Sequence, residues 1–303
     1  MRHVKRITVI FILYLGLLYS QSSYGGLKAW FTASEVALSG GGSALPHVFQ
    51  PRTNPALLAG NPRSVETYMV RYPANIGAES FSLIIPAGVQ TYGFEIRHLG
   101  YGIFDGFDEQ GFETSSYSAN DTWLVGTLGL KSGEGRFKLG ISGGILRSQI
   151  QNYLSYALTG SIGFLWKAKS SKTYASGGLR NLGAVMRSYT KKDQAVPSVL
   201  FLGLSRELKY LPLNIGVDLL LKNEFSDLEA SLAAALITSN EITVLASVSS
   251  NRVQQTTDFV YRNYISSMGV GIIYSSKGIS VKSGAHFIGP GGLVVSAGVS
   301  MGF

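Results

Sequence analysis

Residues Gly292 to Phe303 read GLVVSAGVSMGF, and this last stretch of the chain alternates between two kinds of side chain. One face of a period-two strand would carry the apolar residues Val295, Ala297, Val299, Met301 and Phe303. The other face would carry the small or polar residues Ser296, Gly298, Ser300 and Gly302. Apolar residues facing outward and small residues facing inward are typical of a strand in a lipid-facing barrel. Taken alone, the stretch also fits a C-terminal strand of a soluble β-sandwich.

The composition of the 303 residues favours the barrel. Charged residues make up 15% of the chain and the mean hydropathy is +0.18. Even so, past residue 20 no apolar run approaches the ~20 residues that a membrane helix needs. The 37 glycines and 16 tyrosines suit a crowded lumen and interfacial girdles. The absence of cysteine excludes disulfides and thiolate metal sites.

The first 23 residues predict a secretory signal peptide. A basic stretch from Arg2 to Arg6 precedes an apolar stretch from Ile7 to Leu18, and small and polar residues follow from Ser20 to Gly26. A retained N-terminal anchor is the alternative, but the apolar stretch is short for a membrane span. The formal net charge of +8 becomes 8 − 3 = +5 without Arg2, Lys5 and Arg6. This scattered excess is not the basic stripe that nucleic-acid binding requires, so we expect no nucleic-acid partner.

Residues 63–303 contain recurrent alternation with turn signals, which predicts about fourteen strands and therefore an even-numbered barrel. The predicted strands are 65–72, 79–86, 89–98, 120–131, 135–147, 156–167, 173–180, 197–207, 212–222, 227–237, 241–250, 264–275, 278–287 and 292–303. If Phe303 ends in the periplasm, every second connection is short. The longest connections, Leu99 to Ala119, Asn181 to Val196 and Asn251 to Asn263, would then lie outside the cell. The sequence therefore predicts an all-β, transmembrane antiparallel barrel.

Residues 24–62, which we call the plug segment, do not look like a strand. The segment contains a short helical patch, a triple glycine that includes Gly40 and Gly41, and the sequence Asn54-Pro55-Ala56. These features resemble the start of the mature PorV/PorQ proteins, which are related to the FadL-like outer-membrane barrels. Tyr101 to Phe104 and Gly178 to Gly183 also resemble segments of the PorQ type. The resemblance implies that the plug segment folds back into the barrel lumen.

The end of the chain carries a second resemblance. Ser296, Gly298, Met301 and Phe303 are similar to the terminal signal by which outer-membrane barrels of Gram-negative bacteria are recognised and inserted. We therefore expect the bacterial outer membrane as the location.

Several charged residues are expected to face the lumen on the alternation of their strands: Glu95, Arg97, Arg136, Lys138, Asp218, Lys222, Lys282 and His286. They could form a selectivity ladder for a charged solute. The alternative is that they pair with one another and with the plug segment, because a buried charge is costly without a partner.

No enzyme, cofactor or metal site is predicted. Gly140 to Gly144 fits the G-x-S-x-G pattern, but it lies inside a predicted strand and not at a strand-to-helix turn. The four histidines show no paired metal spacing.

The PorV/PorQ resemblance implies a component of the type IX secretion system. Such a barrel would be a membrane-embedded scaffold for a surface-exposed secretion-system protein, in contact with outer-membrane lipid and lipopolysaccharide. The alternative is a FadL-like transporter of small hydrophobic solutes. A purely structural barrel is a third possibility.

Overall fold

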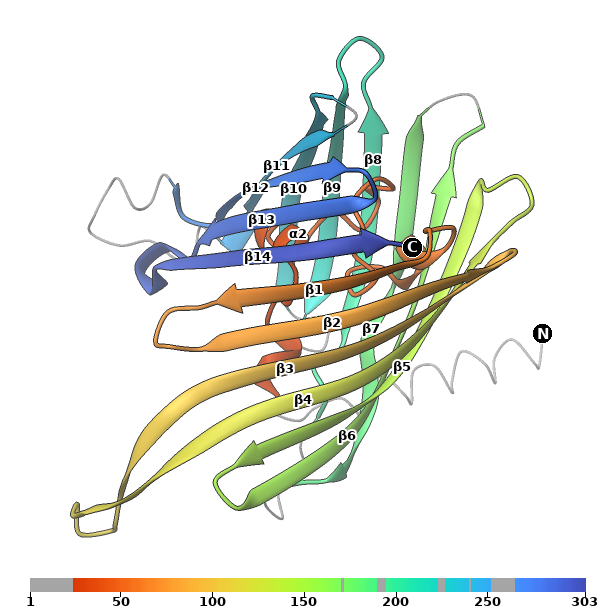
Figure 1. The fold of residues 1–303 in the computed structure, drawn as a ribbon. Helices are drawn as coiled ribbons and strands as arrows, with labels where there is room; N and C mark the ends of the chain where they lie inside the picture. Colours follow the sequence, from red (N-terminus) through yellow and green to blue (C-terminus); the bar gives the residue numbers. More distant parts are fainter. Residues whose placement is uncertain (1–23, 170–171, 190–194, 223–226, 240, 252–264) are drawn as a thin grey trace.

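The computed structural model describes residues 24–169, 172–189, 195–222, 227–239, 241–251 and 265–303. Figure 1 shows these residues as a single barrel with the plug segment inside it. The predicted signal peptide lies outside the described residues. The barrel strands are β1 (Ser64–Arg71), β2 (Gly77–Ala87), β3 (Gln90–Phe107), β4 (Glu113–Lys131), β5 (Phe137–Ile150), β6 (Tyr153–Lys167), β7 (Thr173–Arg187), β8 (Val199–Glu207), β9 (Leu213–Lys222), β10 (Asp227–Ile237), β11 (Ile242–Ser249), β12 (Met268–Ser276), β13 (Ile279–Phe287) and β14 (Leu293–Gly302).

The barrel closes through its first and last strands. Each strand pairs with its neighbour in the sequence, and β1 pairs antiparallel with β14 from Ser64 opposite Gly302 to Arg71 opposite Val295. Closure gives every strand a neighbour on each side, and in lipid an unsatisfied backbone group would cost several kcal/mol. The predicted all-β antiparallel barrel of about fourteen strands is therefore confirmed.

The two faces of the strands separate apolar from polar side chains. On β14, Val295 and Val299 are each 43% exposed on the outside, whereas Ser296 is 7% exposed on the inside. On β9, Val217 and Leu219 face outward while Asp218 is buried. This is the reverse of a soluble protein, and it is the arrangement that lipid outside and a filled lumen inside require.

The connections at the end of the barrel that carries Phe303 are short, as predicted. They comprise residues 88–89, 132–136, 168–172, 208–212, 238–241 and 277–278. We call the opposite end the far end. That the far end lies outside the cell stays a prediction.

Strands β3 to β7 extend further toward the far end than the sequence predicts. The connection expected from Leu99 to Ala119 is mostly strand, because β3 and β4 remain paired as far as Phe107 and Glu113. β7 likewise continues to Arg187. These extensions mix apolar, polar and glycine residues without the strict alternation by which strands are recognised. Figure 1 shows the β3–β4 hairpin projecting beyond the neighbouring strands.

The start of β8 also differs from the prediction. Pro197 was expected in this strand, but the strand begins at Val199, and residues 196–198 are buried instead. Proline has no N–H to donate to a ladder, which explains why pairing starts after it.

The plug segment contains three short helical elements: η1 (Gly25–Lys28), α2 (Ala33–Ala37) and η2 (Pro55–Leu58). Thr32 and Glu35 cap α2 reciprocally, which satisfies backbone N–H groups that a buried helix end would otherwise leave unpaired. α2 contacts β11 to β14 and β1, whereas η2 contacts β3 to β6. Among the described residues, no helix has the length and apolar character needed to cross a membrane.

Candidate functional site: a cavity between plug and wall

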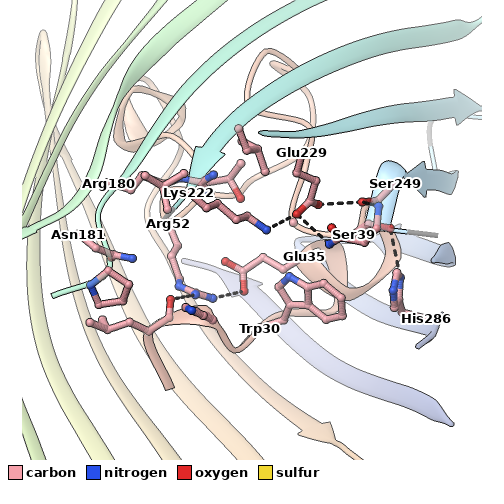
Figure 2. A pocket seen from close by; sticks show the side chains of 18 of the residues that line it. Trp30, Glu35, Ser39, Arg52, Arg180, Asn181, Lys222, Glu229, Ser249 and His286 are labelled. Atoms are coloured by element: carbon pink, nitrogen blue, oxygen red, sulfur yellow. Dashed lines mark hydrogen bonds and ion pairs between the residues drawn. The ribbon is translucent and has the colours of Figure 1, made fainter. Parts of the chain in front are cut away.

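A cavity of about 230 Å³ lies in the lumen between the plug segment and one side of the wall. The plug segment contributes Trp30, Glu35 and Arg52, among others. The wall contributes residues of β7 to β11 and β13 (Figure 2). The cavity therefore depends on the barrel and the plug segment together.

Two ion pairs line the cavity. Arg52 contacts Glu35 at 3.2 Å, and the same Glu35 oxygen accepts a hydrogen bond of 2.7 Å from the backbone N–H of Phe31. Lys222 pairs with Glu229, which also accepts hydrogen bonds of 2.8 Å from Ser249 and Asn251 (Figure 2). Each carboxylate is thus compensated by a cation and by neutral donors, as a charge in a lumen requires.

An aromatic contact closes another side of the cavity. The ring of Trp30 meets the ring of His286 edge-on, with centroids 4.6 Å apart and planes at 70°. His286 Nδ1 lies 3.1 Å from Ser39 Oγ. The wall histidine is therefore held against the plug segment by both an edge-on aromatic contact and a hydrogen bond.

Arg180 and Asn181 occupy a bulge in β7. Gly160 of β6 pairs with Leu182 and Ile162 pairs with Leu179, so two residues of β7 oppose the single residue Ser161. Asn181 has a φ of 55°, in the left-handed region, and its N–H donates to Ser161 Oγ at 3.2 Å. Both Arg180 and Asn181 line the cavity.

The middle of the plug segment is attached by polar groups. Asp218 accepts hydrogen bonds from the N–H of Gly42 at 2.7 Å, from the N–H of Ser43 at 3.0 Å and from the Ser43 hydroxyl. Gly41 lies so close to Ser231 that a Cβ would overlap its hydroxyl, and Gly40 has a φ of 71°. Gly41 therefore allows the backbone to approach the wall, and Gly40 provides a left-handed turn beside it.

The second predicted motif, Asn54-Pro55-Ala56, is attached by close packing. The Asn54 side chain donates to the carbonyls of Ser43 and Phe164, each at 3.0 Å, and accepts from the N–H of Ala56 at 3.0 Å. A Cβ at Gly140 of β5 would overlap the backbone of Pro55 and Ala56. This motif begins η2 and lies directly against the glycines of the wall.

Most of the charges predicted for the lumen lie there. Asp218, Lys222 and His286 have been described above. Glu95 pairs with Arg97, and Lys282 contacts Glu66 at 3.1 Å and the Tyr68 hydroxyl at 2.7 Å. Lys138 faces inward near Gly60.

Arg136 is the exception, and its predicted lumenal position is wrong. It lies in the turn before β5, where it pairs with exposed Glu134 and its side chain is 40% exposed. The predicted strand began two residues earlier than the ladder does.

Five charged residues of the cavity were not predicted: Lys28, Glu35, Arg52, Arg180 and Glu229. Lys28, Glu35 and Arg52 belong to the plug segment, whose path the alternation of the strands does not reveal. Glu229 lies opposite Leu220 and was the one site with a usable signal, an acid at an inward position of the largely apolar strand β10.

The predicted insertion residues lie on both faces of β14. Ser296 and Gly298 face inward, and Gly298 lies beneath the ring of Tyr68, where a Cβ would overlap it. Met301 and Phe303 are 47% and 65% exposed on the outside. Their role in recognition stays a prediction.

Known proteins share the fold but little sequence. No protein-family model matches the chain, and no curated protein matches it. The toluene transporter TbuX of Ralstonia pickettii has a TM-score of 0.61 at 10% identity, over 90% of this chain and 98% of that one. The toluene transporter TodX of P. putida has a TM-score of 0.58 at 13% identity, over 91% of this chain and 99% of that one. The chain thus has the fold of the FadL-like barrels of the bacterial outer membrane.

Proposed function

We propose that this barrel is an outer-membrane passage for small hydrophobic solutes. The observation that carries the proposal is the position of the cavity beside an interruption in the wall. Among the described residues, the ladder between β7 and β8 ends at Arg180 and Val199, although β7 continues to Arg187. Both of these ladder residues line the cavity.

We interpret this interruption as a route for a solute between lumen and lipid. A ladder that stops within a membrane leaves backbone groups without hydrogen bonds, at a cost of several kcal/mol each, so we attribute a function to it. At the end of the β7–β8 ladder, the cavity is bounded by Pro197 and Ser198, which continue no strand. The neighbouring outward residues Leu182 and Met186 are 41% and 67% exposed and apolar. The similarity to two toluene transporters supports the same class of solute.

Uptake by proteoliposomes tests the proposal. We expect saturable entry of radiolabelled toluene above that of protein-free vesicles. Because the plug segment fills the lumen, fixing it to the wall should abolish uptake. Ser39 and Ser247 have their hydroxyl oxygens 2.7 Å apart and the chain has no cysteine, so Ser39→Cys with Ser247→Cys would allow a single cross-link.

The controls are the two single variants and the reduced double variant, all of which should transport. Uptake no greater than in empty vesicles would contradict the proposal. Equal uptake by the cross-linked and reduced forms would show that the plug segment need not move.

The type IX scaffold remains a second candidate because of the projecting β3–β4 hairpin. Ile103, Phe107 and Phe112 on this hairpin are 78%, 61% and 71% exposed. Large apolar side chains gathered beyond the barrel are typical of a contact with another protein. Replacing residues 103–117 with a two-residue turn should then remove a partner from a pull-down of solubilised outer membrane and leave toluene uptake intact. If the variant keeps both its pull-down partners and its toluene uptake, the result counts against the scaffold.

A further inference from the structure

We propose that the cavity binds the carboxylate of a compact organic acid through Arg180 and Asn181. This inference rests on the proposed passage and narrows its solute to one with an apolar body and a single negative charge. The neighbouring structures are described as transporters of toluene, a neutral molecule, so the proposal separates this chain from them.

The first observation is the bulge, which directs two consecutive side chains into one cavity. In a regular strand, successive side chains point to opposite faces. The additional residue in β7 and the left-handed φ of Asn181 remove that alternation, so Arg180 and Asn181 both face the lumen. Asparagine adopts left-handed backbone more readily than most residues other than glycine, so position 181 accommodates the bulge.

The second observation is that Arg180 lacks an anion. Neither Arg180 nor Asn181 makes a side-chain hydrogen bond or ion pair with another described residue, and Arg180 Nε is buried without a partner. The guanidinium lies 5.3 Å from the centre of the Phe201 ring. That contact is worth about 0.5–2 kcal/mol, which is less than the cost of an unpaired buried cation.

The carboxylates nearest to the cavity are already engaged. Glu35 pairs with Arg52, and Glu229 pairs with Lys222. Asp218 accepts its hydrogen bonds from the plug segment. Among the described residues these carboxylates are not available to Arg180, and we assign its anion to a ligand.

The shape of the site defines the ligand. A guanidinium presents parallel N–H groups that match the two oxygens of a carboxylate, and the Asn181 amide adds a further donor. Trp30, Leu220 and Ile288 provide apolar surface for the body of the solute. The volume of about 230 Å³ is below the ~300–1,000 Å³ of pockets for drug-sized ligands, so a long chain would not fit.

Calorimetry of the full-length protein in detergent tests the proposal with benzoate as the probe. The intact protein should bind benzoate saturably, and Arg180→Gln should weaken binding at least tenfold. Arg187→Gln is the matched control, because Arg187 lies on the same strand but is exposed and outside the cavity. Heat-modifiable mobility would establish that both variants are folded.

Two further probes separate the possible failures. Toluene uptake should be equal in the Arg187→Gln control and the intact protein. Unchanged benzoate affinity in the Arg180→Gln variant, with toluene transported by the intact protein, would overturn the carboxylate site and leave the passage standing. Inorganic phosphate binding as tightly as benzoate would also overturn it, because the site would then select charge without an apolar body. Absence of toluene uptake in the intact protein would instead contradict the passage.

Discussion

The plug segment is attached to the wall in two different ways. Near η2, neutral backbone packs directly against Gly129 and Gly140 of the wall. Near α2, backbone also packs against wall glycines, Gly269 and Gly284, but hydrogen bonds of Asp218 and of serine hydroxyls are added there. Water can replace a hydrogen bond, but it cannot replace close packing. We infer that the η2 attachment is the fixed point and that the α2 attachment, with its larger polar share, is the part able to move.

The largest expected effect is at the fixed point. In Gly140→Ala the new Cβ would overlap the backbone of Pro55 and Ala56, and overpacking of this kind costs about 3 kcal/mol. The urea midpoint of the folded barrel should fall accordingly. Gly143→Ala on the same strand is the control, since nothing lies within 4 Å of its Cβ. Equal midpoints for the two variants would refute the idea of a steric attachment.

Asp218→Asn should have a smaller effect, confined to the movable attachment. It removes the charge that accepts from Gly42 and Ser43, and a hydrogen bond to a charged group contributes about 1.5–3 kcal/mol. We expect current in a planar bilayer where the intact protein is silent. Asp105→Asn, on the exposed hairpin, should stay silent. Current from both variants would mean that the loss of the Asp218 charge does not cause the current.

Ser247→Ala tests neutral contacts of the same attachment. Its hydroxyl donates to the carbonyl of Ala37 at 2.8 Å and lies 2.7 Å from the Ser39 hydroxyl, and its loss should lower the free energy of unfolding by about 1 kcal/mol. Ser283→Ala on the outer face of β13 should change nothing. A Ser247→Ala effect as large as that of Gly140→Ala would remove the distinction between the two attachments.

Phe303→Asp should leave both attachments unchanged. A charge near the membrane interface costs only ~0–1 kcal/mol, so stability after refolding should hardly differ. The amount of barrel in the outer membrane should nevertheless fall, because the change removes the terminal aromatic of the predicted insertion signal. Normal amounts of heat-modifiable barrel in cells would contradict that signal.

The wall could be predicted from sequence because lipid and lumen impose opposite demands on alternate residues. Val217 and Asp218 are adjacent, and their chemistry alone assigns their faces. The ends of β3 and β4 could not be predicted, since Asp105 to Ser118 mix aromatic, acidic and small residues without strict alternation.

The cavity was less predictable for a different reason. The proposed role of Arg180 depends on a bulge of one residue and on the lack of a hydrogen-bonding partner among the described residues. Neither feature leaves a pattern in the sequence. Glu35 and Arg52 become a pair only through the path of the plug segment.

The position of α2 has a consequence for the order of assembly. Ser39, just past the end of α2, contacts His286, 247 residues later in the chain, and α2 itself lies against β11 to β14. The site that receives α2 therefore does not exist until the last strands are in place, and contacts so distant in sequence form slowly. Once β1 and β14 have paired, α2 could reach its site only through an open end of the barrel. We expect the seam to close around a plug segment that is already inside, so that a nascent barrel lacking β13 and β14 leaves α2 accessible to protease.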